Sequence, residues 1–267
     1  TVTLANDIDL TDVDFTPIGN KNAAFAGTFD GAGKSIENLN VSGQPAGWIG
    51  LFGQTANTAV VKDFVISGSV TSTINSRAND TDNDFVGGVV GRNKGAISGV
   101  YSSVVVTANN LYNVGGIAGF NDGGRSYFNE GSSSKTALFT DGAGTISGCL
   151  VTGNVTGYQA VGGIAGSSSG NIDSCVVTST VDGRNASSKN GVGGIVGRDN
   201  NDASFYCYTT SNCLFAGTVG RSGQKWTGGI KGFENGTYSA SKGSDGYYYR
   251  TVNGQYVRVG SNVVNSY

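Results

Sequence analysis

The chain has 267 residues, a net charge of −2 and only 13% charged residues. It contains no run of Lys or Arg that could attract the phosphates of nucleic acid, so we expect no nucleic-acid partner. We also expect no membrane insertion. The 45 Gly, 2 Pro and absence of His favour many short strands and exclude Ser/His/Asp triads and His-ligated zinc. Because the sequence has no Met and no recognisable leader, we expect a mature or excised chain.

The first segment, residues 1–53, carries a group of carboxylates. These are Asp7, Asp9, Asp12, Asp14 and Asp30. Two carboxylates held roughly 5 to 9 Å apart can hydrolyse a glycosidic bond, so this group is a candidate for catalysis. The alternative is that each Asp accepts hydrogen bonds from its own backbone within a turn.

A glycine motif recurs between residues 48 and 232. It consists of an aromatic residue or Val, two Gly, an apolar residue, any residue and a further Gly. The copies are Trp48–Gly53, Phe85–Gly91, Val114–Gly119, Val161–Gly166, Val192–Gly197 and Trp226–Gly232. Their spacing indicates about six degenerate repeats with a unit of roughly 28 to 31 residues, interrupted by insertions.

A strand-like segment with alternating apolar residues follows five of these motifs. Its inner positions are large, large, small and large in Phe64, Ile66, Gly68, Val70; in Cys149, Val151, Gly153, Val155; in Cys175, Val177, Ser179, Val181; and in Cys213, Phe215, Gly217, Val219. In a fifth copy, Val100, Ser102, Val104, Val106, the small residue stands at the second position instead of the third. A period of two places each set on one face of a strand. Units this small must stack and share a continuous core, which predicts a solenoid.

The segments VGGIAG and VGGIVG, each followed by a strand such as GNIDSCVVTSTV, resemble GLUG-motif repeats. The opening residues, from ANDIDL to WIGLFG, resemble the leading repeat of the same family, so the resemblance covers about Leu4 to Gly232. The copy Trp226–Gly232 departs most from the pattern, with Lys231 where the other copies have a small or apolar residue. The family occurs in bacterial surface adhesins and in the N-terminal regions of immunoglobulin A proteases. The resemblance implies a right-handed parallel β-helix outside the cell, without established catalytic residues, and turn roles for the N-terminal Asp residues.

The next candidate site along the chain is the acidic run at residues 80–84. Asp80, Asp82 and Asp84 have the spacing that opens a calcium loop. The match fails afterwards, because Phe85 stands where a calcium loop needs Gly and no Glu follows at the twelfth position. A solvated acidic loop is therefore the favoured interpretation, and we expect no metal and no cofactor.

The longest insertion covers residues 120–142. It contains Tyr127, Phe128 and Phe139 among polar residues, a mixture that suits the binding of sugar or protein. Loops on a rigid scaffold often carry function. The competing interpretation is a flap that only covers the side of the solenoid.

The cysteines fall into two groups. Cys149, Cys175 and Cys213 share one register, which predicts that they stack as small interior hydrophobic residues. Cys207 lies outside this register. In an oxidising environment, Cys207 and Cys213 form the favoured candidate disulfide.

Residues 243–267 have the pattern of a β-hairpin. Alternating Tyr, Arg and Val strands flank Asn253 and Gly254, a preferred pair for a type I′ turn. We expect this segment to cap the C-terminal end of a solenoid formed by residues 1–242. Tyr247, Tyr249 and Tyr256 are candidates for contact with a partner.

Together with the family resemblance, these patterns predict an all-β, single-stranded right-handed parallel β-helix of about seven or eight coils. We expect a non-catalytic extracellular or cell-surface protein that acts as an adhesive, stalk, matrix, sheath or filament module. Its expected partner is a host or neighbouring-cell glycan or protein, or another copy joined head to tail. The alternative is a carbohydrate-active β-helix enzyme, a polysaccharide hydrolase or lyase that uses surface carboxylates.

Overall fold

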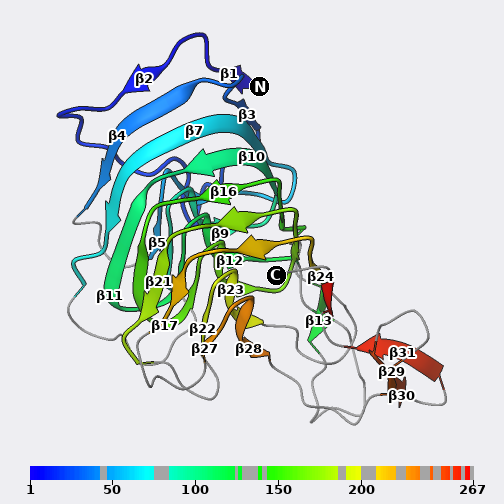
Figure 1. The fold of residues 1–267 in the computed structure, drawn as a ribbon. Coiled ribbons are helices and arrows are strands. Elements are labelled where there is room, and N and C mark those ends of the chain that lie inside the picture. Colours follow the sequence, from blue (N-terminus) through cyan, green and yellow to red (C-terminus); the bar gives the residue numbers. More distant parts are fainter. Residues whose placement is uncertain are drawn as a thin grey trace.

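The computed structural model describes residues 1–42, 47–74, 84–123, 143–185, 191–199, 209–220 and 227–234, together with short strands at 126–127, 138–139, 241–242, 248–252, 255–259 and 262–264. Within these ranges the chain is all β, contains no helix and pairs its strands mostly in parallel. Figure 1 shows the coils stacked in chain order from the blue N-terminal strands to the orange strands near residue 230. This confirms the all-β parallel architecture predicted from the repeats.

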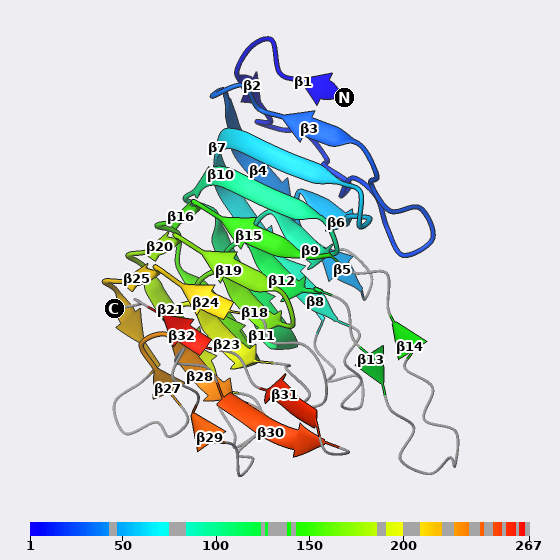
Figure 2. The same cartoon turned by 90° about the vertical axis from the view of Figure 1, so that its right-hand side faces the viewer.

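The coils contribute strands to parallel ladders that run along the stack, visible side by side in Figure 2. The first ladder contains β1 (Val2–Thr3), β3 (Thr28–Asp30), the start of β7 (Val60–Thr71), the start of β10 (Ala96–Ser102), β15 (Thr145–Ser147), β19 (Asn171–Asp173), β24 (Thr209–Ser211) and β32 (Asn262–Val264). The second contains β2 (Ile8–Asp9), the start of β4 (Ser35–Val41), the middle of β7, the end of β10, β16 (Leu150–Val151), β20 (Val176–Val177) and β25 (Leu214–Phe215).

Three further ladders complete each coil. The third contains the ends of β4 and β7, the start of β11 (Val105–Gly115), the start of β17 (Val155–Gly162), β21 (Thr180–Gly183) and β26 (Thr218–Val219). The fourth contains β5 (Trp48–Ile49), β8 (Phe85–Gly87), the ends of β11 and β17, β22 (Val192–Gly193) and β27 (Thr227–Gly228). The fifth contains β6 (Phe52–Gln54), β9 (Val90–Asn93), β12 (Ala118–Asn121), β18 (Ala165–Ser168), β23 (Val196–Asp199) and β28 (Lys231–Glu234).

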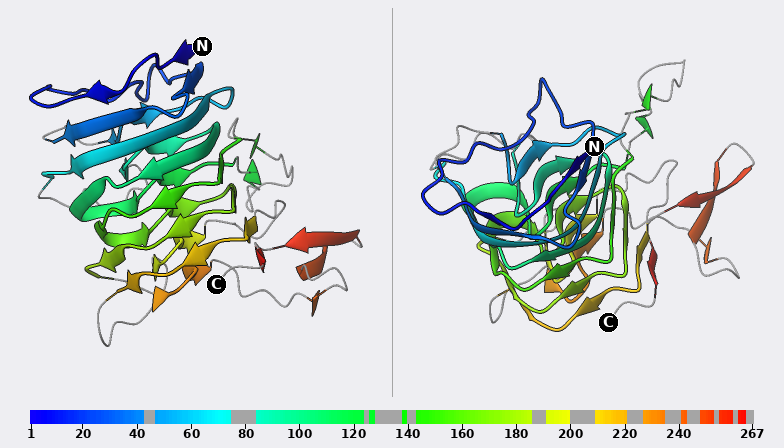
Figure 3. Two further views of the ribbon diagram at one scale, coloured as in Figure 1. Left: turned by 45° about the horizontal axis from the view of Figure 1, so that its top comes forward. Right: turned by 90° about the horizontal axis from the view of Figure 1, so that it is seen from above.

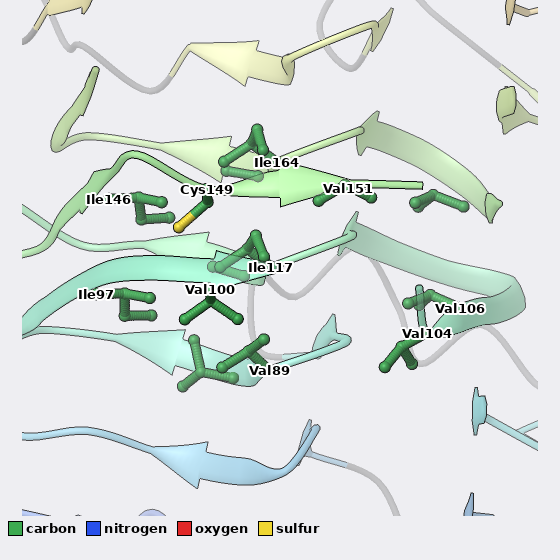
Figure 4. Close-up of a cluster of buried hydrophobic side chains, with 14 of the residues drawn as sticks. Val89, Ile97, Val100, Val104, Val106, Ile117, Ile146, Cys149, Val151 and Ile164 are labelled. Atoms are coloured by element: carbon green, nitrogen blue, oxygen red, sulfur yellow. The ribbon is translucent and has the colours of Figure 1, made fainter. Parts of the chain in front are cut away.

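The core consists of equivalent side chains stacked from coil to coil. In Figure 4, Ile97 lies next to Ile146, and Val89, Ile117 and Ile164 form another column. Ile97 and Ile146 are direct partners in the parallel register. All five side chains are at most 1% exposed. The alternating positions are buried as well, with Val100, Val151 and Val177 each 0% exposed, so the alternation in the sequence identified the interior correctly.

The four alternating core positions lie on two ladders, whereas the sequence placed them on one strand face. The first two positions belong to the second ladder and the last to the third, so the small residue stands where the chain passes between ladders. At Gly153 a Cβ would lie 2.1 Å from the carbonyl oxygen of Val104, and at Gly217 it would lie 2.0 Å from that of Ser179. In these two coils the position is Gly because the backbone of the neighbouring coil occupies the space, whereas Val104 fills the equivalent position of its own coil.

The paired glycines of the motif are required by close packing. A Cβ at Gly163 would lie 2.2 Å from the carbonyl oxygen of Gly194 and 2.7 Å from a methyl carbon of Val177. Gly116 has the same relation to Val151, also at 2.7 Å. Neither glycine has a positive φ. The motif therefore provides space between coils and across the core, and no unusual backbone conformation.

A different position in the coil does require the left-handed conformation. It lies immediately before the second ladder, with φ between 52° and 61° at Asp63, Gly99, Gly148, Ser174 and Asn212. Gly, Asn and Asp adopt this conformation most readily, and Ser less so. The shared bend is therefore encoded by different residues in successive coils.

A buried polar ladder joins the coils at the end of the fifth ladder. Thr55 donates a hydrogen bond to the side chain of Asn93 at 2.8 Å, Asn93 donates to Asn121 at 2.9 Å, and Asn121 donates to Ser168 at 3.2 Å. Asn93 and Ser168 also bond the turns that follow them, through Gly95 and Gly170. Thr55, Asn93 and Asn121 are thus each satisfied by the equivalent residue of the next coil, and Ser168 by its own turn.

The insertion and the C-terminal segment contribute strands outside the five ladders, which Figure 3 shows beside the stack. β13 (Ser126–Tyr127) pairs antiparallel with β14 (Leu138–Phe139). β30 (Tyr248–Val252) pairs antiparallel with β29 (Ser241–Lys242) and β31 (Gln255–Val259). β32, which the sequence grouped with the hairpin, pairs in parallel with β24. The capping role of the hairpin and the number of coils remain predictions.

The packing of the motif glycines predicts that Ala substitution costs much more stability at one motif position, Gly163, than at the equivalent Gly229. Gly163→Ala forces a methyl group against the carbonyl oxygen of Gly194, so we expect it to lower the free energy of unfolding by about 3 kcal/mol. Gly229→Ala is the matched control, because Gly229 occupies the same motif position and its added Cβ meets no atom of the described residues within 4 Å. We expect the control to change stability by less than about 0.5 kcal/mol in urea unfolding. Equal losses in both variants would contradict the packing explanation.

Candidate functional site

The outward face of the second ladder carries a column of exposed or half-exposed apolar side chains. Parallel register stacks Val65 on Tyr101, Tyr101 on Leu150, Leu150 on Val176 and Val176 on Leu214. Tyr101 is 53% exposed, while Val65 and Leu214 are each more than 40% exposed. We call this set the apolar column. Large apolar residues in a continuous exposed row commonly mark an interaction surface.

A hydroxyl column runs beside the apolar column, two residues further along each coil. It contains Ser67, Ser103, Thr152 and Thr178, and ends at Ala216. Coil-to-coil backbone hydrogen bonds hold it in place, such as that from Thr152 N–H to the carbonyl of Ser102 at 2.9 Å. We call the two columns together the strip.

The strip contains no charged residue, although charges stand close to it. Lys62 contacts Asp30 at 2.7 Å and Asp63 at 2.9 Å on the side of the first ladder. Asp173, on the same side, accepts hydrogen bonds from Ser211 and Asn212. Within these five coils the charged groups therefore lie outside the two columns. One coil nearer the N-terminus, Ser35 pairs with Val65, and the exposed carboxylate Glu37 follows two residues later.

The N-terminal carboxylates serve as turn and coil-joining acceptors. Asp7 accepts a hydrogen bond from Ser35 N–H at 2.8 Å, and Asp9 accepts from Thr11 and from the amide of Asn38 at 2.9 Å. Asp30 accepts from Ala32 N–H at 2.9 Å, in addition to its ion pair with Lys62. These bonds agree with the turn roles that the family resemblance implied.

The electrostatics of these carboxylates do not provide a general acid. The backbone hydrogen bond from Ser35 lowers the pKa of Asp7, and the side-chain bonds from Asn38 and Thr11 lower that of Asp9. Lys62 and the Ala32 amide lower the pKa of Asp30. Glycoside hydrolysis needs one carboxyl group with a raised pKa beside one that is ionised. The pKa values of these three Asp residues are all lowered, so none of them has the raised pKa of a general acid.

Asp12 and Asp14 line a shallow hollow of about 480 Å³ beside the same segment. Its other lining residues are Leu10, Thr11, Val13, Asn38, Asn40 and Ser42. Asp12 has a left-handed backbone, with φ of 60°. The hollow combines surface carboxylates with amide and hydroxyl groups, and it opens at the N-terminal turn where Asn38 bonds Asp9.

An ion pair with aromatic neighbours lies on the fourth and fifth ladders. Arg92 donates two hydrogen bonds to one carboxylate oxygen of Asp122, at 2.6 and 3.1 Å, and the Asp122 side chain is 1% exposed. The guanidinium carbon lies 5.4 Å from the Trp48 ring centroid and 5.8 Å from that of Phe120. Phe85 packs between these rings. The paired and covered charge holds neighbouring coils together.

The three cysteines that share a register are buried in the core, as predicted. The Sγ of Cys175 lies 3.3 Å from the carbonyl oxygen of Asp173. Hydrogen bonding with the thiols of Cys149 and Cys213 is the main cause that raises the pKa of Cys175 well above the usual thiol value, and burial raises it further. A protonated, buried thiol is a poor nucleophile, which fits a packing role.

Several predicted site residues lie outside the described part of the chain. These are Asp80, Asp82, Phe128, Tyr247 and Cys207. The calcium loop and the disulfide from Cys207 to Cys213 therefore remain predictions. Asp84 precedes β8, and burial raises its pKa.

The remaining candidates for partner contact lie on strands outside the ladders. Tyr127 and Phe139 stand on β13 and β14, and Tyr249 and Tyr256 stand on β30 and β31. The register pairs Tyr127 with Leu138 and Tyr256 with Thr251, so the two antiparallel units do not share a strand. Their roles in binding remain predictions.

Within the described ranges, no group of three or more Cys, Asp or Glu residues is placed to hold a metal ion. No helix in the same ranges is long and apolar enough to cross a membrane.

The sequence interpretation missed the strip, although the signal was present. The same alternation that identified Phe64 and Ile66 as core residues places Val65 and Ser67 outward. Aligning these outward residues across coils gives Val65, Tyr101, Leu150, Val176 and Leu214 as one column.

Comparison with known proteins gives a fold and one local sequence match. No family model matches the chain. A solved structure of a "putative immunoglobulin A1 protease" from Bacteroides ovatus has a TM-score of 0.66 and 20% sequence identity, covering 99% of this chain and 67% of that one. Halomucin of Haloquadratum walsbyi is 32% identical over 108 residues. That match spans 39% of this chain and 1% of halomucin.

The lowered carboxylate pKa values predict acid sensitivity of the N-terminal coils. A carboxyl group with a depressed folded pKa stabilises fully above its unfolded pKa and loses this contribution as pH falls through the folded value. For Asp7, Asp9 and Asp30 the loss begins near the ordinary value of 3.8 and continues below it. Urea unfolding between pH 6 and pH 2 should show stability falling below about pH 4.

Asp9→Asn keeps a side-chain oxygen as acceptor but cannot ionise, so its stability should depend less on pH over this range. Asp12→Asn is the control, because it removes a charge from the same segment without touching the Asp9 hydrogen bonds. If both variants flattened the pH dependence equally, net charge rather than hydrogen bonding would be its cause.

Proposed function

We propose that the chain is a non-catalytic extracellular solenoid that forms an adhesive or structural part of a cell-surface protein. The observation that carries this proposal is the state of the carboxylates around the N-terminal turn. Asp7, Asp9 and Asp30 are held by turn and coil-joining bonds with lowered pKa values, while the exposed strip offers binding groups without charge. This combination suits recognition and rigidity rather than bond cleavage.

The extracellular location rests on three similarities. The glycine motifs and the strands after them resemble GLUG-motif repeats, and we infer membership of that family. The fold resembles that of a structure described as a "putative immunoglobulin A1 protease", and part of the sequence is similar to halomucin. We infer that the solenoid is a module for display outside the cell, and that any protease activity would belong to other segments of such proteins.

The finer architecture belongs to the same proposal. We infer a right-handed β-helix of about seven or eight coils, with residues 243–267 protecting its C-terminal end. An unprotected strand edge pairs readily with another chain, so a solenoid needs such protection. β32 supports the inference, because it continues the first ladder beyond β24.

The partner is proposed to be a glycan or protein of a host or neighbouring cell, or another copy in a head-to-tail filament. Tyr127, Phe128 and Phe139 in the insertion, and Tyr247, Tyr249 and Tyr256 near the hairpin, remain candidate contacts. A cystine between Cys207 and Cys213 would suit the same oxidising location.

A single set of measurements tests the non-catalytic role. The purified chain is incubated with neutral and acidic polysaccharides, and new reducing ends and unsaturated products are measured. We expect no product above that formed by heat-denatured protein, and rod-shaped particles in electron microscopy. Release of sugar that is abolished by Asp9→Asn or Asp30→Asn would instead establish the polysaccharide hydrolase or lyase alternative.

A further inference from the structure

The strip on the outer face of the second ladder has a definite chemical character. Its apolar column offers aliphatic and aromatic surface, and its hydroxyl column offers donors and acceptors at the same repeat. We propose that the strip binds an extended, neutral, β-linked polysaccharide chain that lies parallel to the solenoid axis. This inference rests on the proposed adhesive role and names the ligand class for it.

The apolar column matches one face of such a chain. Sugar rings have C–H faces that pack on aliphatic and aromatic side chains, and Tyr101 presents a ring that is 53% exposed. Adjacent strands repeat about every 4.8 Å, and an extended β-linked glycan advances by roughly one ring over that distance. Val65, Tyr101, Leu150 and Val176 can therefore contact successive sugars of a single chain.

The hydroxyl column matches the edges of the same rings. The Ser103 hydroxyl lies 3.4 Å from the carbonyl oxygen of Ile66, and that of Thr152 lies 3.5 Å from that of Ser102. Both are long bonds that leave oxygen lone pairs available. Thr178 is exposed on the same column. Each hydroxyl can accept from, or donate to, a hydroxyl group of the sugar.

These hydroxyls also argue against the face of another protein sheet as the occupant. Packing two sheets face to face would dry the strip and leave Ser103 and Thr152 with only their long bonds to backbone carbonyls. A buried hydroxyl that is not satisfied costs roughly 1 to 3 kcal/mol. A polyhydroxylated ligand supplies a partner at every coil.

The lack of charge selects a neutral polymer. An acidic glycan would need Lys or Arg beside the bound chain to compensate its carboxylates or sulfates. No residue of the strip is charged, and nearby Lys62 is already paired with Asp30 and Asp63. Neutral glycans therefore fit the strip, and acidic ones do not.

The test uses the full chain and insoluble or gel-embedded polysaccharides. Retention is measured on regenerated amorphous cellulose, and mobility is measured in gels that contain neutral arabinoxylan, neutral mannan or acidic carboxymethylcellulose, which keeps the β-linked backbone. We expect the wild-type chain to bind at least one neutral polymer and to show no shift with carboxymethylcellulose.

Two variants place a charge within the strip at exposed positions. Tyr101→Lys alters the apolar column and Thr178→Lys the hydroxyl column, and each should weaken binding at least tenfold. Val2→Lys is the matched control, because Val2 is an apolar residue on an outer strand with 52% exposure, close to the 53% of Tyr101. The control should bind as the wild type does. Circular dichroism and urea unfolding are used to check that all three variants are folded.

Three outcomes would overturn the inference. Binding that survives in both strip variants would place the ligand elsewhere on the chain. Absence of binding to every neutral polymer would exclude the ligand class. A concentration-dependent dimer that Tyr101→Lys dissociates, without polysaccharide binding, would assign the strip to a second copy of the chain.

The result is distinguishable from the test of the proposed function. A chain that cleaves polysaccharide refutes the non-catalytic role, whether or not the strip binds. A chain that neither cleaves nor binds keeps the structural role and loses only the glycan assignment.

Discussion

Parallel pairing in register places each residue against the equivalent residue of the next coil, and this constraint decides which amino acids each position accepts. Where the neighbouring coil presents a carbonyl oxygen, as at Gly163, a Cβ has no space. Where a buried amide must be satisfied, its partner is another polar group one coil away, as between Asn93 and Asn121. A residue is therefore selected by contact with its counterparts more than by its sequence neighbours.

The core positions of the coils could be predicted because this constraint repeats in the sequence. The glycine motif and the alternation around Val151 and Val177 recur with the same spacing, so aligning the repeats identified core positions without structural information. Their placement on two ladders could not be predicted. Alternation continues through the small position at Gly153 and gives no sign that the chain passes from one ladder to the next there.

Other features left no common signal. The left-handed bend before the second ladder is filled by Asp63, Gly99, Ser174 and Asn212 in different coils, because several residues tolerate or locally stabilise that conformation. β32 was not foreseen, since a short run of Asn and Val acquires its role only by pairing with β24. The strip was predictable in principle, because outward residues alternate with core residues, but its meaning depends on the ladders being aligned.

Function in such a fold follows from which positions remain free to vary. Inward residues are fixed by stacking, and glycines by the backbone of the next coil, so recognition is confined to outward columns, ends and insertions. One exposed Tyr or Thr makes a weak contact. A column of equivalent contacts on a rigid frame binds a repeating polymer far more strongly, because the first contact places the others at high effective concentration. The regular spacing that stabilises the coils thus also favours a ligand with a repeat of its own, which is why the strip points to a polymeric partner.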